Sequence, residues 1–478
     1  MSHQDRTRRA YVETYGCQMN ISDGELMEGV LERAGYEVVA TPEEADVVLV
    51  NTCAVREHAE RRVLGRVSQL GGLKRERPGL LLGVTGCMAQ RMGKALLERA
   101  PYVDLVMGPD GYRSLPESLD RLSPAHPSGE DRPRGARTPA AGASESTPDG
   151  VSEARRRLAV LDLSLGENYE GLTQRRARGA SAWVTVQRGC DHRCTFCIVP
   201  YVRGPEKNRS AHEVLAEVRS LAEAGVSDVT LLGQTVNSYA RDGWTFPALL
   251  RAVARVDGIR RVWFTSPHPN DVTEELVEVM ATETAVCEQL HLPLQSGNDR
   301  VLRRMLRRYS VERYLEKVEL VRAAVPDVSL STDVIVAFPG ETDAEFRDTL
   351  DVMRHVRFDD AFTYRYSPRD GTPATRLPEA DSVPDDVARA RLEELIGVAR
   401  EIQAEINRQE VGRVVEVLVE KEARGEGQVL GRTRRNKVVA FSGDPVLVGS
   451  YVHVALEGTS GATFTGSAAD ARVAAGSP

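Results

Sequence analysis

Three cysteines lie in one short run of the chain, spaced C-x3-C-x2-C. They are Cys190, Cys194 and Cys197, within the segment RGCDHRCTFCIVPYVRG. Cysteine thiolates are the usual ligands of iron–sulfur clusters, and a four-iron cluster normally takes four of them. Three neighbouring thiolates can hold three irons and leave the fourth iron open to bind a small molecule and pass an electron into it. The spacing predicts a cluster of this kind.

A zinc knuckle is the alternative interpretation of the same run, with His192 as a fourth ligand. Structural zinc motifs usually present paired C-x2-C units. No second pair lies nearby in the sequence. The sequence therefore favours the cluster over zinc.

A second set of three cysteines is spread over the first part of the chain. Cys17, Cys53 and Cys87 each follow an apolar run that is typical of a strand: VETYG, VLVNT and GVTG. Ligand sites form where the carboxyl ends of parallel strands meet, so we expect the three thiols to converge and hold a second cluster. The alternative is three unrelated buried cysteines, because cysteine is often buried. Cys287 has no partner by spacing, and we interpret it as structural.

Convergence of Cys17, Cys53 and Cys87 requires a sheet of parallel strands. The runs YVETYG, DVVLVNT and LLLGVTG alternate with helical patterns around residues 25–34 and 56–70. This alternation predicts a doubly wound α/β domain over residues 8–122. From residue 123 the composition shifts to Pro, Ala, Ser, Gly and Arg, which predicts a flexible linker or insertion over residues 123–175.

The central segment contains six apolar runs, each followed by an amphipathic helix, such as those at 211–224, 299–324 and 342–356. The runs are AWVTVQRG, DVTLLGQ, RVWFTS, EQLHLPLQ, VSLSTDVIVAF and DAFTYRYS. Six βα units resemble an incomplete barrel, here over residues 176–409, in which the working residues lie at the carboxyl ends of the strands. The short β patterns RVVEVLVE, KVVAFS and SYVHVALE predict a small β-barrel over residues 410–474.

Composition limits the classes of partner. The 478 residues carry a formal net charge of −8, so nucleic-acid contact must come from local basic patches. No run of about 20 apolar residues and no apolar signal-peptide core is present, which predicts a cytoplasmic protein without membrane association. In that reducing compartment, seven cysteines favour metal binding or catalysis over disulfides.

Two basic clusters are candidates for RNA contact. The first lies in GRTRRNK, between β patterns of the terminal barrel, and consists of Arg432, Arg434, Arg435 and Lys437. A short run of charges by itself is more often a solvated loop, but the position of this one in the terminal barrel reverses that preference, and we expect these four residues to bind RNA phosphates. The second consists of Arg303, Arg304, Arg307 and Arg308, whose spacing predicts one side of a helix. This side can equally contact RNA or keep the helix soluble.

Several fragments, together with the two cysteine sets, resemble the radical S-adenosylmethionine methylthiotransferase family. They are YGCQMN, NTCAVRE, TGCMAQR, LLGQTVNSY, LHLPLQSGND and YSPRDGTPA. The resemblance covers nearly all of the chain except Ser123–Ser152, and GCQMN is similar to the MiaB-type subgroup. Enzymes of this subgroup convert N6-isopentenyladenosine, beside the tRNA anticodon, to its 2-methylthio derivative. One departure is Ala337, in DVIVAFPGE, where the family usually carries glycine; we expect the extra methyl group to be tolerated.

The resemblance implies a fold, cofactors and a reaction. The fold is a methylthiotransferase N-terminal domain, a partial (β/α)6 radical SAM barrel and a TRAM RNA-binding barrel. The cofactors are two [4Fe-4S] clusters and S-adenosylmethionine. An electron enters the catalytic cluster on Cys190, Cys194 and Cys197 and cleaves S-adenosylmethionine, and the resulting radical removes hydrogen from C2 of the adenine. The cluster on the other cysteine set presents sulfur, and a second S-adenosylmethionine supplies the methyl group.

Residues around the cysteines receive roles from their positions. Gly233 and Gln234, after the second barrel strand, and Ser296 and Gly297, after the fourth, are expected to bind S-adenosylmethionine; turn chemistry is the equal alternative.

Two asparagines and two histidines are further candidates. Asn20 lies close to Cys17 and Asn51 close to Cys53 in the sequence. They are expected to tune the cluster on Cys17, Cys53 and Cys87 by hydrogen bonds, or else to cap turns. His268 and His291 are interpreted as satisfied buried histidines.

The expected partners are a tRNA carrying isopentenyladenosine and an electron donor such as a flavodoxin or ferredoxin, with the chain acting as a monomer. Within the family, the alternative targets are threonylcarbamoyl-adenosine in tRNA and a ribosomal protein. A hypothesis of another class is a non-catalytic RNA-binding iron–sulfur protein that senses redox state. Release of 5′-deoxyadenosine after reduction would distinguish the enzyme from the sensor.

Overall fold

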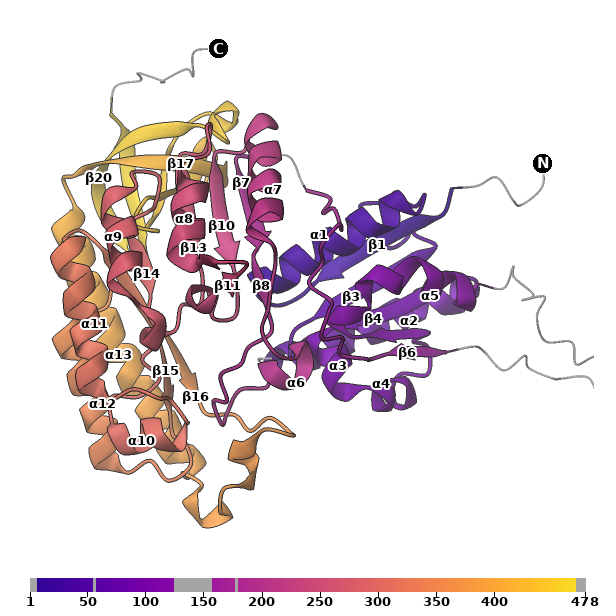
Figure 1. The fold of residues 1–478 in the computed structure, drawn as a ribbon, viewed down its shortest axis with the longest axis horizontal. Coiled ribbons are helices and arrows are strands. Elements are labelled where there is room, and N and C mark those ends of the chain that lie inside the picture. Colours follow the sequence, from indigo (N-terminus) through magenta and orange to yellow (C-terminus); the bar gives the residue numbers. More distant parts are fainter. Residues whose placement is uncertain (1–6, 55–56, 124–156, 177–178, 470–478) are drawn as a thin grey trace, which may run out of the picture. The chain divides into compact units, whose positions relative to one another are not determined.

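The computed structural model describes residues 7–54, 57–123, 157–176 and 179–469. The chain divides into two compact units (Figure 1). The first comprises Met1–Ser164 and Gly171–Arg175, and the second comprises Leu165–Glu170 and Arg176–Pro478. Residues 124–156, which hold most of the predicted linker, lie outside the described part. None of the described helices is long and apolar enough to cross a membrane.

The first unit is built on a six-stranded sheet in which all neighbouring strands run parallel. In spatial order the strands are β2 (Glu37–Val38), β1 (Arg9–Thr14), β3 (Val47–Thr52), β4 (Leu81–Gly86), β5 (Leu105–Met107) and β6 (Leu158–Val160). The helices are α1 (Gln18–Arg33), α2 (Glu57–Glu76), α3 (Cys87–Met92), α4 (Lys94–Arg99) and α5 (Leu115–Leu122). Strand β3 is buried at every position, as its Val and Leu residues predict. The predicted doubly wound α/β domain is confirmed.

Strand β6 changes one predicted boundary. It comes from the stretch 123–175, which the composition assigns to a linker, yet it pairs in parallel with β5 through Leu105↔Leu158 and Met107↔Val160. The described residues up to Ser164 therefore belong to the first unit. The apolar run LAV is too short to be recognised without its partner strand.

The second unit contains the predicted partial barrel of six parallel strands. They are β7 (Ser181–Thr185), β10 (Asp228–Leu232), β13 (Arg261–Phe264), β14 (Gln289–His291), β15 (Ser329–Val336) and β16 (Asp360–Arg365). A parallel bridge between Val262 and Val286 joins the sheet of the first three strands to that of the last three. The helices are α7 (Ala211–Glu223), α8 (Phe246–Ala254), α9 (Glu274–Thr282), α10 (Asp299–Arg304), α11 (Val311–Ala324), α12 (Asp343–Val356) and α13 (Asp385–Glu410). Two short antiparallel pairs are β8 (Gln187–Arg188) with β9 (Lys207–Asn208) and β11 (Ala240–Arg241) with β12 (Trp244–Thr245).

The helix predicted over residues 299–324 is two helices, and this prediction is wrong. Helix α10 ends at Arg304, and Leu306 adopts a φ of 54°, which a helix does not accommodate. Helix α11 then begins at a new cap, where the Ser310 hydroxyl accepts a hydrogen bond from the Arg313 amide at 3.2 Å. The four arginines 303, 304, 307 and 308 therefore do not share one helix side.

The C-terminal part of the second unit is a closed five-stranded barrel in the order β17-β18-β19-β21-β20. The strands are β17 (Val414–Glu422), β18 (Gln428–Thr433), β19 (Val438–Ser442), β20 (Tyr451–Ser460) and β21 (Thr463–Ala468). Alternate residues such as Val417, Val419, Phe441 and Phe464 fill its core. The predicted small β-barrel is confirmed.

Ala337, directly after β15, has a φ of 59°. The left-handed conformation costs an L-residue about 1–2 kcal/mol, whereas glycine adopts it freely. The methyl group is accommodated at this buried position, but the backbone that carries it is strained. The tolerance expected from side-chain size alone is therefore incomplete.

The Ala337→Gly variant is expected to be more stable than the parent by about 0.5–1 kcal/mol. Relief of the left-handed strain exceeds the extra unfolded-chain entropy of glycine, which is about 0.4–1 kcal/mol. Urea denaturation of both proteins measures the difference. Ala323→Gly, at an exposed position of α11, is the matched control and should lose about 1 kcal/mol. A loss of stability in Ala337→Gly as large as in the control would contradict the assignment of strain.

Candidate functional site

The C-x3-C-x2-C cysteines lie on the loop that follows β7 and β8, at the carboxyl ends of the barrel strands. The loop is held closed where the Cys190 amide donates to the Gly204 carbonyl at 3.2 Å. Gly189 has a φ of 70°, and a Cβ there would lie 1.9 Å from the Pro205 carbonyl oxygen. Only glycine therefore fits directly before the first cysteine. Helix α6 (Val199–Arg203) begins two residues after Cys197, the last cysteine of the run.

The chemistry of these thiols fits a bound metal cluster. Cys190 and Cys194 are buried, and burial raises the pKa of the Cys190 thiol. Burial likewise raises the pKa of Cys197 to about 12. Such thiols keep their protons at neutral pH unless a metal ion replaces them, and coordination deprotonates a thiol outright.

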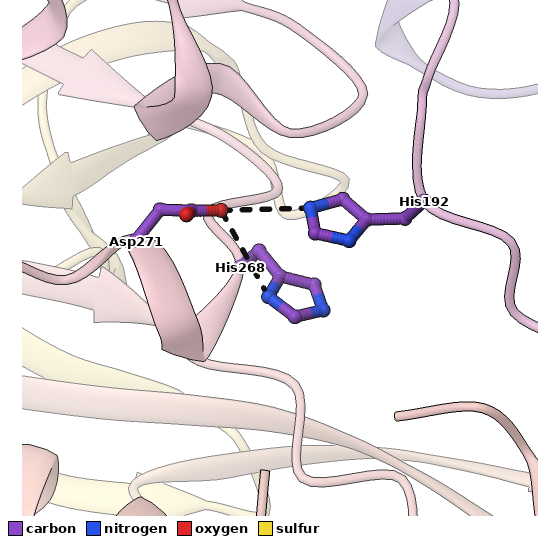
Figure 2. Close-up of side chains that lie close together, drawn as sticks. All are labelled: His192, His268 and Asp271. Carbon is purple, nitrogen blue, oxygen red and sulfur yellow. Dashed lines mark ion pairs between the residues drawn. The ribbon is translucent and has the colours of Figure 1, made fainter. Parts of the chain in front are cut away.

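Figure 2 shows that His192, from the cysteine loop, faces His268 and Asp271, which follow β13. The two imidazole rings stack with centroids 3.9 Å apart, and His192 Nε2 lies 3.5 Å from Asp271 Oδ2. Burial, aided by the charge of Arg307, lowers the pKa of His268 to about 2, so this ring is neutral. The interpretation of His268 as a buried, satisfied histidine is supported, because its Nδ1 accepts a hydrogen bond from the Asn270 amide.

This arrangement does not favour the zinc knuckle. Among the described residues, His192 groups with His268 and Asp271 rather than with the cysteines. Zinc–sulfur bonds of about 2.3 Å would bring all ligand atoms close together, whereas a cluster binds each thiolate at a different iron. The histidine group instead ties the cysteine loop to the end of β13.

The second cysteine set lies at the carboxyl ends of three adjacent parallel strands of the first unit. Cys17 caps α1 after β1, Cys53 follows β3, and Cys87 begins α3 after β4. The register Thr14↔Asn51↔Thr85 aligns the three strand ends. The point between β1 and β3 is also where the strand order reverses, which is the usual ligand position of an open α/β sheet.

Glycines allow these strand ends to approach one another. A Cβ on Gly16 would lie 2.5 Å from the Cβ of Cys53, and a Cβ on Gly86 would lie 2.5 Å from the Thr52 carbonyl oxygen. The backbone beside each outer cysteine therefore passes directly against the central strand end. The convergence that the sequence predicts is present in the backbone.

Asn20 and Asn51 link the same strand ends. Asn20 Oδ1 accepts from Cys17 Sγ at 3.3 Å, and its Nδ2 donates to the Thr52 carbonyl at 3.2 Å. Asn51 Nδ2 donates to the Asn20 carbonyl at 2.7 Å. Within the described residues, buried Asn51 Oδ1 has no hydrogen-bond partner, which leaves an acceptor available beside the cysteines.

The four residues predicted to bind S-adenosylmethionine have different surroundings. A Cβ on Gly233 would lie 2.9 Å from the Val236 Cα, so the backbone is closely packed there. Gln234 Oε1 is buried and has no hydrogen-bond partner in the described part of the chain. The Gly297 amide and the Ser296 hydroxyl both contact Thr349 Oγ1 of α12, at 2.9 and 3.5 Å. A ligand role is therefore better supported for Gln234 than for the pair after the fourth strand.

Sequence reasoning missed Arg307 as part of this site. It was grouped with the RNA-contact arginines, but its guanidinium is buried and its Nη1 lies 3.4 Å from Cys194 Sγ. Its neighbour Arg304 is paired with Asp381 at 2.5 Å. The only local signal is Ser310, whose capping tendency indicates that the helix restarts and the intervening residues turn. Cys287 is buried, as a structural role requires.

The basic loop 431–437 docks the small barrel on the partial barrel. Arg434 binds Glu288 through both Nε and Nη2, at 2.9–3.2 Å, and donates to the carbonyls of Thr284 and Val286. Lys437 Nζ lies 2.9 Å from Asp359 Oδ1. The other two cations are also paired: Arg435 with Glu410 and Asp359, and Arg432 with Glu420.

The start of β13 contributes further contacts to the same junction. Fully buried Arg261, at the start of β13, donates to the carbonyls of Arg432 and Glu416 at 2.8 and 3.0 Å. Arg260 stacks on the Tyr451 ring at 3.7 Å. These contacts lie at the amino ends of the barrel strands, whereas the cysteine loop lies at their carboxyl ends. The loop holds the domains together at the end of the barrel away from the cysteines.

A double-mutant cycle on Arg434→Ala and Glu288→Ala is expected to give a coupling free energy of about 0.5–1 kcal/mol. The pair is bidentate, but both side chains are a quarter to a third exposed, so solvent screens it. Urea denaturation of the four proteins measures the coupling. Arg432 and Glu420, which pair within the small barrel, provide the control cycle. Hydrogen exchange at residues 284–288 should quicken in Arg434→Ala and not in Arg432→Ala. Equal exchange in both variants would contradict the docking role.

Comparison with known proteins adds to this geometry. Residues 9–108 match the uncharacterized protein family UPF0004, residues 184–353 the radical SAM superfamily and residues 408–467 the TRAM domain. A tRNA-2-methylthio-N6-dimethylallyladenosine synthase of Carboxydothermus hydrogenoformans is 43% identical, covering 93% of this chain and 95% of its own. A protein of the same name from Frankia casuarinae is 48% identical over 91% of this chain and 76% of its own.

Solved structures share the fold at low identity. The radical S-adenosylmethionine methyltransferase TsrM of Kitasatospora setae, with cobalamin and a [4Fe-4S] cluster bound, aligns with a TM-score of 0.54 and 17% identity. The alignment covers 89% of this chain and 77% of that one. At this identity the likeness concerns the fold alone.

Proposed function

The chain belongs to the family of tRNA-2-methylthio-N6-dimethylallyladenosine synthases, which are radical S-adenosylmethionine methylthiotransferases. We propose that it transfers a methylthio group to C2 of N6-isopentenyladenosine in tRNA. The observation that carries the proposal is the pair of three-cysteine sets, each at the carboxyl ends of parallel strands. One set fits a cluster that binds S-adenosylmethionine, and the other fits a cluster that presents sulfur.

The residues divide the work between the two units. Cys190, Cys194 and Cys197 hold a [4Fe-4S] cluster with one open iron, and the buried amide oxygen of Gln234 is available to S-adenosylmethionine. In the other unit, Cys17, Cys53 and Cys87 hold the second cluster. When bound, these cofactors supply the radical that removes the C2 hydrogen and the methylated sulfur that replaces it. Cys190 and Cys194 in one set and Cys53 and Cys87 in the other are buried, which limits the access of water to them.

Partners follow from the reaction. The TRAM barrel contributes to tRNA binding. Reduction of the cluster requires a small electron-transfer protein, and we assign this role to a flavodoxin or ferredoxin. We further propose that the chain acts as a monomer in the cytoplasm, where its tRNA substrate is made.

Mass spectrometry of tRNA nucleosides tests the function directly. In cells that lack this protein, 2-methylthio-N6-isopentenyladenosine should disappear and N6-isopentenyladenosine should accumulate. The parent protein should restore the product, and Cys190→Ala should not. If the lost nucleoside is instead the 2-methylthio derivative of threonylcarbamoyl-adenosine, or if only a ribosomal protein loses its modification, the proposed substrate is wrong.

The contribution of the basic loop to tRNA affinity is expected to be small. A phosphate contact contributes about one unit to the salt slope of log affinity. Because carboxylates already neutralise these cations, neutralising Arg432, Arg434, Arg435 and Lys437 together should lower the slope by less than about one unit per residue. Binding of tRNA across a salt series measures the slopes. A loss of about four units would show that RNA displaces the carboxylates.

A further inference from the structure

Arg307 carries a buried positive charge beside the cysteine loop. It lies in the six-residue break between α10 and α11, where Leu306 takes a left-handed conformation and reverses the chain. The side chain of Arg307 is buried, whereas Leu306 and Arg308, on either side, are exposed. Because the helix is broken here, the Arg307 side chain lies in the interior, whereas that of Arg308 lies in solvent.

The contacts of the guanidinium are well defined. Nη1 donates to Cys194 Sγ at 3.4 Å, Nε donates to the Tyr309 hydroxyl at 3.0 Å, and Nη2 donates to the Pro293 carbonyl at 3.4 Å. The Tyr309 hydroxyl is itself fixed by the carbonyls of Pro293 and Leu294, at 3.0 and 2.9 Å. This support leaves Arg307 little freedom to move away from the sulfur.

In the described part of the chain, no carboxylate pairs with this charge. Within the part of the chain that the structure describes, Arg307 forms no ion pair, and its partners are a thiol, a hydroxyl and a carbonyl. Its guanidinium also lies 5.1 Å from the centroid of the Tyr309 ring. Fully buried Arg261, by contrast, pairs with the carboxylate of Glu416 at 3.0 Å. A buried charge is costly unless an opposite charge accompanies it. The partner that this chain offers is the thiolate set, which becomes negative when it binds iron.

We propose that Arg307 is a positioning residue that fixes the Cys194 sulfur and raises the reduction potential of the cluster held by Cys190, Cys194 and Cys197. The inference rests on the proposed function, because it requires a cluster at these cysteines. Reduction adds one electron, supplied by an electron-transfer protein, and no proton. A fixed cation next to a ligand sulfur stabilises the more negative, reduced state more than the oxidised state. Hydrogen bonds to cluster sulfurs act in the same direction.

The geometry separates this role from that of the other nearby groups. Cys190 Sγ contacts the neutral Thr235 hydroxyl at 3.9 Å and has a backbone hydrogen bond from His192. His268 is neutral, so it adds no positive charge at the rim. Among the hydrogen bonds given for the described residues, that of the Arg307 guanidinium brings a full positive charge to a sulfur of this set.

Three variants test the proposal in the full-length protein with both clusters reconstituted. Arg307→Met removes the charge and the donors at similar volume. Arg307→Lys keeps the charge but loses the planar fork that reaches the sulfur and Tyr309 together. Arg308→Met removes the adjacent exposed charge and is the matched control. The readout is a redox titration followed by electron paramagnetic resonance, restricted to the signal that changes when S-adenosylmethionine is added. Iron and sulfide content and the Kd for S-adenosylmethionine are measured alongside.

Arg307→Met should hold parent-like iron and be at least tenfold harder to reduce, which corresponds to 59 mV for one electron. Arg307→Lys should lie between this variant and the parent, and Arg308→Met should match the parent. If Arg307→Met fails to hold iron, Arg307→Lys decides, and an unchanged midpoint in it overturns the proposal. An unchanged midpoint together with weaker binding of S-adenosylmethionine also overturns it, because Arg307 would then serve the ligand alone. If the parent itself shows no signal that responds to S-adenosylmethionine, it is the proposed function that fails.

Discussion

Replacement of any one of Cys190, Cys194 and Cys197 with alanine is expected to abolish cleavage of S-adenosylmethionine. In a cluster with three thiolate ligands each thiolate binds a different iron, so two thiolates cannot hold a cluster with a single open iron in the required orientation. Formation of 5′-deoxyadenosine after reduction should fall to the level measured without enzyme. The iron content should fall by about half, because one of two similar clusters is lost.

Cys287→Ala is the matched control for this experiment. Cys287 is also a buried cysteine of the second unit, but it lies before β14, at the opposite ends of the strands. Its replacement should leave iron content and cleavage unchanged. Full cleavage activity in any of the three single variants would remove the basis for assigning the cluster to this loop.

Replacement of Cys17, Cys53 or Cys87 with alanine is expected to separate the two halves of the reaction. These residues lie in a different unit from the barrel, so reductive cleavage of S-adenosylmethionine should continue to some extent. The iron content should fall by about half, and no methylthiolated nucleoside should form, because the sulfur-presenting cluster is absent. Quantifying 5′-deoxyadenosine and modified nucleoside in the same reaction measures both outcomes.

The Asn51→Asp variant is expected to have a smaller effect than the cysteine variants. Asp keeps the shape of Asn51 and loses the donor to the Asn20 carbonyl. A residue that orients ligands typically contributes 10–100-fold to metal affinity or activity, so the product should decline rather than vanish. A triple cysteine variant that retains all the iron of the parent would show that these three thiols hold no cluster.

The sequence by itself determined the chemistry and most of the architecture. The six cysteines predicted to hold clusters, the strand-like apolar runs that precede them and the strand patterns of the terminal barrel are all recognised from local sequence. A run such as VVLVNT is recognised as a buried strand without knowledge of its neighbours, and the spacing of Cys190, Cys194 and Cys197 is a property of the chain alone. Because parallel strands end at one edge, the alignment of the strand ends that precede Cys17, Cys53 and Cys87 also followed from the pattern.

Only the tertiary structure decided how the charged residues are used. The sequence does not show whether an arginine faces solvent, RNA, a carboxylate or a sulfur, because its burial depends on which segments pack against it. The turn at Leu306 places the Arg307 guanidinium against Cys194. Acidic residues at the amino ends of the barrel strands pair with the basic loop 431–437, for which the sequence predicts RNA contact. Strand β6 and the left-handed Ala337 likewise depend on partners distant in sequence. Local propensity sets where strands and helices form, whereas the pairing of a charge or the strain of one backbone angle is fixed by contacts that only the folded chain brings together.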